Sequence, residues 1–336
     1  MRVLIIGRYK KQYDNLMPFV TEQGASIAAL GNDVDYYIIK GNGFLSYFKA
    51  VKGLKKKIDE FKPDIVHAHY GLSGITAVLQ NEVPVVTTFH NGETLGFSQN
   101  LLSSIFSLKA KHVIYVAQHI YDKAYFKRKN RYTILPCGVN LDECVITPFE
   151  EAGKMLDFEK SKKYIIFGGG FDNSRKNFPL LNEALILLTG KQGVAKQRKV
   201  YVADEEFTLS SYDYGDIEVF EMKNMSRQQC VLLMCACDLF ALPSKSEGSP
   251  QALKEAMACN CPILATDIAD VKHLLGDVEG HYICSFDVQN VMEQVRESIA
   301  FNGITEGRKR IAELGLSNEQ VADSLISCYN KVCKNV

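Results

Sequence analysis

Short apolar runs alternate with longer amphipathic stretches along the first 136 residues. Runs with the length and β-branched content of buried strands occur at 3–6, 34–39, 63–69, 83–90, 112–117 and 132–136. Between them, residues 15–30 and 44–61 carry the spacing of helices with one apolar face. Parallel strands joined by crossover helices produce this alternation, because each strand is then covered on both faces. The pattern therefore predicts a doubly wound α/β domain.

The alternation loosens after Pro136 and restarts near residue 163. Residues 147–163 are polar and charged, and we place the interdomain linker there. Further strand-like runs follow at 163–168, 199–203, 217–220, 238–243 and 262–266. A chain of 336 residues is long enough for two cores.

We therefore predict an α/β protein of two doubly wound domains, 1–155 and 156–315. A C-terminal helix at 316–336 would return to the first domain. Ligands of such folds bind beyond the carboxyl ends of the strands, so we expect the site in a cleft between facing domains.

Composition narrows the class of protein. Hydrophobic residues make up 46% and charged residues 23%, so both halves can bury a core. No segment approaches the roughly 18 to 20 apolar residues of a membrane-spanning helix. Residues 1–8 are interpreted as a first strand and not as a signal peptide. The ten cysteines form no C-x-x-C pair, which favours reduced, mostly buried thiols. We expect a cytoplasmic protein.

The net charge is zero, but residues 1–150 have 18 Lys and Arg against 13 Asp and Glu, a balance of +5. The remainder has a balance of −5. The first half would therefore be the one to meet an anionic surface. No nucleic-acid partner is expected.

The most informative segment, residues 242–262, reads LPSKSEGSPQALKEAMACNCP. It predicts a strand, a loop with Glu247, and a helix. Ser249 is suited to the N-cap, Pro250 to the first helical position and Asn260 to a left-handed C-cap. Free backbone N–H groups and the helix dipole would make this helix start a seat for phosphate.

Glu247 lies in the loop before that helix and Glu255 lies inside the helix. A carboxylate that accepts two hydroxyl hydrogen bonds is the usual holder of a ribose or hexose diol. An ordinary capped helix with one solvated glutamate explains the pattern equally well. From the residues alone, both interpretations stay open.

More of the chain agrees with a sugar-binding site. Glu247 and Glu255, followed by AMAC and Pro262, resemble the paired-glutamate motif of family 4 retaining glycosyltransferases of the GT-B fold. Segments 63–71, 85–92 and 135–140 resemble that family's N-domain signatures. Segments 226–243 and 262–267 resemble its C-domain elements around the motif. The ordered match spans about residues 60 to 285.

The resemblance implies two Rossmann-like domains and transfer of a sugar from a nucleotide-diphosphate sugar, with a UDP-sugar favoured. It implies retention of anomeric configuration, and we expect no metal and no cofactor. The expected acceptor is a glycan or a lipid-linked glycan in surface polysaccharide synthesis. The runner-up functions are a nucleotide-sugar 2-epimerase of the same fold and a non-catalytic nucleotide-sugar binding protein.

The family also implies roles for individual residues of the motif. Glu255 would grip the ribose, and Glu247 would contact hydroxyls of the donor sugar. The loop backbone that approaches sugar and phosphate would comprise Gly248, Ser249 and Gln251. Pro250 replaces part of the commoner Glu-Gly-Phe-Gly form and lacks an N–H, so one donor must come from Gln251 or Ala252.

A second site segment, residues 166–177, reads IFGGGFDNSRKN. A diphosphate leaving group requires cations, and Arg175 and Lys176 end this loop. Lys176 aligns with a lysine of the family, whereas a glycine fills the usual arginine position and Arg175 is a plausible substitute. Gly170 is expected beside the donor. The glycines do not match the G-x-G-x-x-G spacing, which disfavours a dehydrogenase. Two solvated surface cations remain the alternative.

His90 ends a strand and is followed by Asn91 and Gly92. It resembles the family histidine that contacts the donor sugar and the acceptor region. His67 and His69 point to one sheet face by alternation, and we favour a structural role over a metal pair.

Two further patterns carry weaker predictions. Asp33-Val-Asp35 matches a D-x-D metal motif, but it opens a strand instead of following one, so we expect no metal site. The basic stretches 49–61 and 123–131, the second with Tyr125 and Phe126, predict weak association with an anionic membrane. A solvated lysine-rich face is the alternative. The protein could thus be peripheral at the inner face of the membrane.

Overall fold

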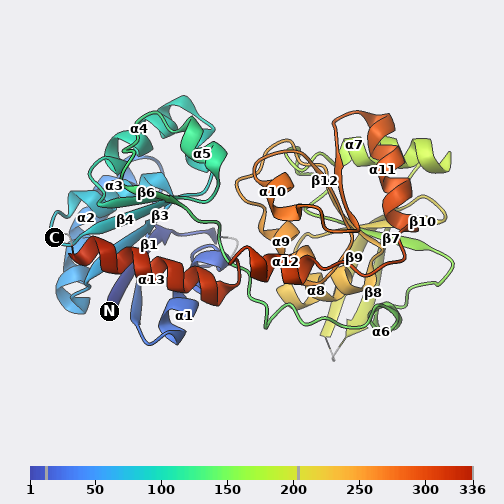
Figure 1. Cartoon of the computed structure of the whole chain (residues 1–336), viewed down its shortest axis with the longest axis horizontal. Helices are drawn as coiled ribbons and strands as arrows, with labels where there is room; N and C mark the ends of the chain where they lie inside the picture. Colours follow the sequence, from blue (N-terminus) through green and yellow to red (C-terminus); the bar gives the residue numbers. More distant parts are fainter. Residues whose placement is uncertain (12–13, 203–204, 335–336) are drawn as a thin grey trace. The chain divides into compact units, whose positions relative to one another are not determined.

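The chain folds into two compact units, shown in Figure 1. The computed structural model describes residues 1–11, 14–202 and 205–334. Unit 1 comprises Met1–Gly138 and Leu316–Val336, and unit 2 comprises Val139–Gly315. Each unit has its own sheet and its own hydrophobic core, as the two successive alternating patterns predict.

Unit 1 contains a parallel six-stranded sheet in the order β2-β1-β3-β4-β5-β6. Its strands are β1 (Arg2–Arg8), β2 (Asp33–Ile39), β3 (Ile65–His69), β4 (Val85–Phe89), β5 (His112–Tyr115) and β6 (Tyr132–Ile134). Its helices are α1 (Pro18–Ala29), α2 (Leu45–Phe61), α3 (Gly71–Leu79), the 3-10 helix η2 (Gly92–Thr94), α4 (Phe97–Ser107), α5 (Gln118–Lys123) and α13 (Asn318–Lys334). The six predicted strands are all present.

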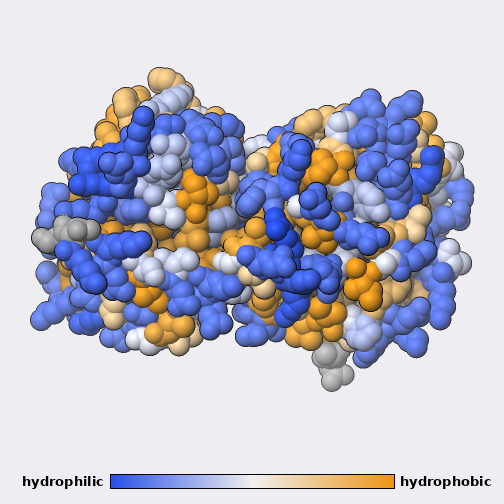
Figure 2. All heavy atoms as spheres, viewed as in Figure 1, coloured by the Kyte–Doolittle hydropathy of each residue, from blue (hydrophilic) through white to orange (hydrophobic). Residues whose placement is uncertain are grey.

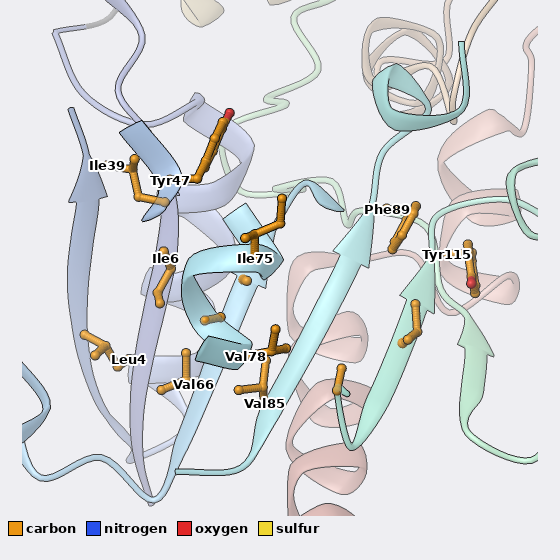
Figure 3. Packing of buried hydrophobic residues seen from close by; sticks show 14 of the residues in the cluster. Leu4, Ile6, Ile39, Tyr47, Val66, Ile75, Val78, Val85, Phe89 and Tyr115 are labelled. Carbon is orange, nitrogen blue, oxygen red and sulfur yellow. The ribbon is translucent and has the colours of Figure 1, made fainter. Parts of the chain in front are cut away.

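The core of unit 1 lies between the sheet and its helices, as Figure 3 shows for the side of Leu4, Ile6 and Val66. These three strand side chains are fully buried. Helix α2 adds Leu54 and Ile58, whose spacing of four residues places both on one helical face. The apolar face of each amphipathic stretch is thus the face that covers the sheet.

Helix α13 follows unit 2 in the chain but packs in unit 1, against α1. Its Tyr329 is fully buried, and the hydroxyl lies 2.6 Å from Nδ1 of His67 in the central strand β3. Helix α13 thus belongs to unit 1, although it follows unit 2 in the chain.

Unit 2 contains a seven-stranded sheet in the order β13-β12-β11-β7-β10-β9-β8. Its strands are β7 (Lys163–Phe167), β8 (Val194–Val202), β9 (Glu205–Asp213), β10 (Ile217–Glu221), β11 (Leu239–Leu242), β12 (Ile263–Thr266) and β13 (His281–Cys284). Its helices are α6 (Phe149–Met155), α7 (Phe178–Thr189), α8 (Arg227–Ala236), α9 (Gln251–Ala258), α10 (Val271–Leu275), α11 (Val288–Ala300) and α12 (Gly307–Glu313). β8 and β9 pair antiparallel at the edge, whereas the other strands of unit 2 run parallel.

The division between the units lies at Gly138 and Val139, earlier than the boundary at residue 155 that we expected. The segment from 139 onward is held in unit 2, because the Arg308 guanidinium donates to the carbonyls of Leu141 at 2.8 Å and Cys144 at 2.7 Å. Helix α6, which packs against α8, occupies part of the expected linker 147–163. The helix is short and has two acidic residues in its first turn, Glu150 and Glu151, so its sequence has the polar character of a linker.

All ten cysteines are free and seven of them are buried. Within the described residues, no helix combines the length and the apolar content that crossing a bilayer requires. In unit 2, β7 lies between β10 and β11, so the chain order reverses beside β7. The loops that leave β7 and β11 diverge at such a switch point, where ligands of doubly wound folds bind.

Candidate active site

The loop after β7 begins with three glycines whose lack of side chains leaves room for neighbours. A Cβ atom on Gly168 would lie 2.7 Å from the ring of Phe240. A Cβ atom on Gly169 would lie 2.7 Å from Cγ of Lys176. The glycine at position 169 thus allows the stem of Lys176 to cross the backbone of its own loop.

Lys176 reaches across to the loop that follows β11. Its Nζ atom lies 2.8 Å from Oε1 of Glu247, and these side chains are only 13% and 8% exposed. The backbone joins the same two loops, because the N–H of Lys245 donates to the carbonyl of Arg175 at 2.8 Å. Two residues predicted for one site from separate segments therefore lie in contact.

Arg175 itself is exposed, next to Lys176 in the chain. Its backbone N–H donates to the side chain of Asn173. The structure therefore brings Lys176 and Glu247 together and leaves Arg175 at the surface of the same loop.

Helix α9 begins one residue later than we expected. The N-cap is Pro250, which makes no side-chain capping bond, and the helix starts at Gln251. Pro250 has an extended backbone with a ψ of 113° and is therefore not yet helical. The predicted N-cap, Ser249, consequently lies in the loop before the helix. Asn260 adopts the predicted left-handed conformation with a φ of 55°. Gly248 and Ser249 are half-buried beside the free N–H groups of the first turn.

Glu255 lies in α9 and is 8% exposed. Its Oε1 atom lies 3.2 Å from Nη2 of Arg227, whose Nη1 atom lies 3.1 Å from Oε2 of Glu143. Arg227 is the first residue of α8, which Ser226 starts with a complete capping box. Sequence reasoning missed Arg227 as a site residue, although the capping box marks where it lies.

Lys254, the neighbour of Glu255, was also missed. It is fully buried in α9, which is rare for a lysine. Burial raises the pKa of the Asp270 carboxyl, while the charge of Lys254 opposes that rise. The buried Lys254 of α9 thus acts through its charge on Asp270, the residue that precedes α10.

In unit 1, the carboxyl ends of β3 and β4 bring three histidines together. The rings of His69 and His90 stack with centroids 5.2 Å apart, and Nδ1 of His69 lies 3.0 Å from Nε2 of His90. Both nitrogens of His67 are occupied, by Tyr329 and by Thr88 at 2.7 Å. Burial and the neighbouring histidine lower the pKa of His69 and of His67, so both rings are neutral near pH 7.

The backbone at these strand ends is unusual. Tyr70 has a φ of 70° and Asn91 a φ of 98°, values that cost energy in residues other than glycine. Glu93 organises both turns, because its carboxylate accepts the N–H of Gly71 at 2.9 Å and that of His90 at 3.1 Å. Glu93 was missed from the sequence, where a single glutamate after Gly92 gives no signal of burial.

The D-x-D pattern behaves as part of a strand. Asp33 is the first residue of β2 and Asp35 the third, and Asp35 pairs with Lys57 at 2.5 Å. Across the described residues, no cluster of three His, Cys, Asp or Glu side chains has the arrangement of a metal site.

Two family profiles together match most of the chain. The profile described as Glycosyltransferase Family 4 matches residues 20–143, and Glycosyl transferases group 1 matches residues 149–314. The chain therefore belongs to the glycosyltransferases that these two profiles describe, family 4 and group 1. The segments that carry the sequence resemblance, including Glu247 and Glu255, fall within the two matched regions.

The chain is also similar to individual proteins. A Bacillus subtilis protein named as a glycosyltransferase of teichuronic acid biosynthesis, TuaC, is 25% identical over 68% of this chain, and the chain spans 58% of that protein's length. Sucrose-phosphate synthase from Thermosynechococcus elongatus has the same fold, with a TM-score of 0.79 at 15% identity and full coverage of both chains. HepE from Anabaena, solved with UDP and glucose, has a TM-score of 0.73 at 12% identity, covering 98% of this chain and all of HepE.

The buried Glu93 predicts a pH dependence of stability. Burial raises the pKa of its carboxyl from 4.5 to about 7, although backbone N–H groups that donate to it oppose the rise. Protonation therefore favours the folded state, and this contribution is complete below about pH 4.5 and lost as the pH rises through 7. Its size is about 1.4 kcal/mol per unit of pKa difference.

The free energy of unfolding of the parent should decline between pH 4.5 and 7 as Glu93 loses its proton. Glu93→Gln has no group that titrates at this position, so the decline should be smaller in the variant. Urea unfolding across that range measures it, with the difference in slope between the two proteins as the readout. Glu82→Gln, which removes an exposed carboxylate of the same unit, is the control. Parallel pH profiles of the parent and Glu93→Gln would contradict the prediction.

Proposed function

We propose that the protein transfers a sugar, with retention of configuration and without a metal, from a nucleotide-diphosphate sugar to a glycan or lipid-linked acceptor. The observation that carries the proposal is the buried pair of Lys176 and Glu247 at the switch point of unit 2. Glu255 lies in α9, the helix that follows the loop of Glu247. A cation and two carboxylates at the carboxyl ends of β7 and β11 have the chemistry that a diphosphate and two diols require.

In the proposed complex, the carboxylate of Glu255 accepts the ribose hydroxyls. Arg227 supports this role as a positioning residue, because its contact holds the carboxylate in one orientation. Glu247 accepts hydroxyls of the donor sugar, with Lys176 beside it. The N–H groups at the start of α9, from Gln251 onward, face the diphosphate together with Gly170 of the β7 loop.

The leaving group determines what catalysis has to supply. A nucleoside diphosphate leaves with charge on its terminal phosphate, whose pKa is about 6, so it needs charge stabilisation more than a proton. Lys176 and Arg175 supply that positive charge, and the dipole of α9 adds to it. His90 is assigned to the donor sugar, with its ring orientation fixed by His69.

The nature of the donor and of the product is supported by two relatives. HepE, which has the same fold, was solved with UDP and glucose, and this favours a UDP-sugar. TuaC is named for teichuronic acid biosynthesis, and this favours a glycan acceptor.

Lys176→Gln should lower kcat by about 10²–10³-fold, because it removes charge stabilisation at the leaving group. EDTA should leave the activity of the parent unchanged. The assay measures release of UDP from UDP-sugars with and without a glycan acceptor. Lys245→Gln, which removes an exposed cation of the neighbouring loop, is the control, and thermal unfolding verifies that each variant folds.

Loss of activity in EDTA with recovery in magnesium or manganese would contradict metal independence. Conversion of the donor sugar without acceptor would identify an epimerase instead. Donor binding without turnover under any condition would identify a binding protein.

We also propose that unit 1 docks on an anionic membrane, where a lipid-linked acceptor would be presented. Large apolar side chains are exposed around α4 and the segment after α5, as Figure 2 shows over α4. Phe97 is 72% exposed, and its ring lies 5.8 Å from that of Tyr125. Phe126 is also exposed, and Lys123 and Lys129 flank these aromatics. Apolar and cationic groups side by side favour an acidic lipid surface.

The lysines of α2 contribute less to this surface than the sequence suggested. Lys55 pairs with Glu82, Lys56 with Glu60 and Lys57 with Asp35, so much of their charge is offset. The aromatic patch therefore carries the docking proposal.

Phe97→Asp should reduce recovery of the protein with vesicles that contain an anionic lipid, because it replaces apolar contact by repulsion. Sedimentation at low and moderate salt measures this, and binding of the parent should weaken as salt rises. Leu187→Asp changes an exposed apolar residue in unit 2 and is the control. Equal recovery of the parent with anionic and neutral vesicles would overturn the docking proposal.

A further inference from the structure

The sheet of unit 1 has a second edge, opposite to the one that carries His69 and His90. The strands β4, β5 and β6 are neighbours and run parallel, so their amino ends lie side by side. Lys111 directly precedes β5, and Arg131 directly precedes β6. Two cations that are twenty residues apart in the chain are thereby brought to one edge.

A pocket of about 500 Å³ opens at this edge. Lys109, Lys111, Arg128 and Arg131 line it, with Val83 and Pro84 among its apolar lining residues. Within residues 1–11, 14–202 and 205–334, none of these four cations is in an ion pair. Glu82 is the acidic residue among those that line the pocket, and its carboxylate lies 2.5 Å from Nζ of Lys55. The four cations therefore outnumber the one acidic residue that lines the pocket.

The framework around the pocket is held by hydrogen bonds. The buried side chain of Gln80 accepts the N–H groups of Glu82 and Val83 and donates to the carbonyl of Val83 at 2.6 Å. The N–H of Lys111 donates to the carbonyl of Val85 at 2.8 Å, and that of Val113 to the carbonyl of Arg131 at 3.0 Å. The backbone that carries the cations is therefore fixed before a ligand arrives, which lowers the entropic cost of binding.

We propose that this pocket binds a phosphate-bearing anion of about the size and charge of a diphosphate. Concentrating like charges costs free energy unless a counter-charge offsets them. Two arginines provide planar donors for phosphate oxygens, and the two lysines add point charges. The site is separate from the donor site of unit 2, since each of its residues belongs to unit 1. The same group could reach it on a lipid headgroup or on a soluble metabolite.

Inorganic pyrophosphate is the first probe, because it has the group without lipid or nucleoside. Calorimetry at low ionic strength compares the full chain with Lys111→Ala/Arg131→Ala. Both proteins also carry Lys176→Gln, so that binding in unit 2 contributes little. The double substitution should weaken binding at least tenfold, and binding to the unsubstituted pocket should weaken as salt rises.

The matched control is Lys123→Ala/Lys129→Ala, which removes the same charge from the same unit without touching the pocket. It should bind pyrophosphate within about twofold of the unsubstituted pocket, as expected for a screened, more distant charge. Slower amide hydrogen exchange in residues 80–85 and 109–113 on addition of pyrophosphate would locate the ligand. Equal affinities of the two double variants, or unchanged exchange in those residues, would overturn the proposal.

Vesicles separate the two sources of the phosphate group. If the natural ligand is a headgroup, vesicles with phosphatidic acid should retain the protein through Lys111 and Arg131, and pyrophosphate should compete. If it is soluble, pyrophosphate should bind without displacing the protein from vesicles. Either result keeps the pocket as an anion site.

Discussion

The contact between Lys176 and Glu247 joins the two loops on which the proposed donor site depends. The loops leave β7 and β11, neighbouring strands whose following segments diverge at the switch point of the unit 2 sheet. Because both side chains are nearly buried, removing one would leave an uncompensated charge, at a cost of about 3–5 kcal/mol. Gly169 permits the contact by leaving space for the lysine stem. The absence of a side chain at position 169 is thus a requirement of this contact.

Buried ion pairs of this kind rarely give more stability than apolar side chains of equal volume. Unit 2 nevertheless has two of them around α8, α9 and the loops after β7 and β11: Lys176 with Glu247, and Arg227 with Glu255. It also has a fully buried lysine, Lys254, whose charge acts on Asp270. A ligand with a diphosphate and several hydroxyls could exchange partners with such groups, whereas an apolar core could not. This is the physical reason to regard the cluster as a binding site.

The sequence predicted the two-sheet architecture because strands buried on both faces give strong apolar runs, as in 3–6 and 163–168. It missed β9, the neighbour of the edge strand β8, because its nine residues begin with two glutamates and include three acidic residues in all. It placed the first domain boundary at 155, because nothing in the sequence shows that Arg308 binds the carbonyls of Leu141 and Cys144.

The prediction of the site has the same limits. Lys176 and Glu247 belong to motifs with fixed spacing, so their contact could be expected. Arg227, Lys254 and Glu93 function through burial and through partners distant in the chain, which no local pattern encodes. The binding of a nucleotide-sugar donor by Glu247, Glu255 and Lys176 remains a prediction.

The most direct test of the donor site is calorimetric titration of UDP into the parent protein and Glu255→Ala. Loss of a charge-assisted hydrogen bond of about 1.5–3 kcal/mol should weaken binding roughly 10- to 150-fold. Glu143→Ala removes the other partner of Arg227 and should retain most of the affinity. Equal affinity of the parent and Glu255→Ala for UDP would contradict the account.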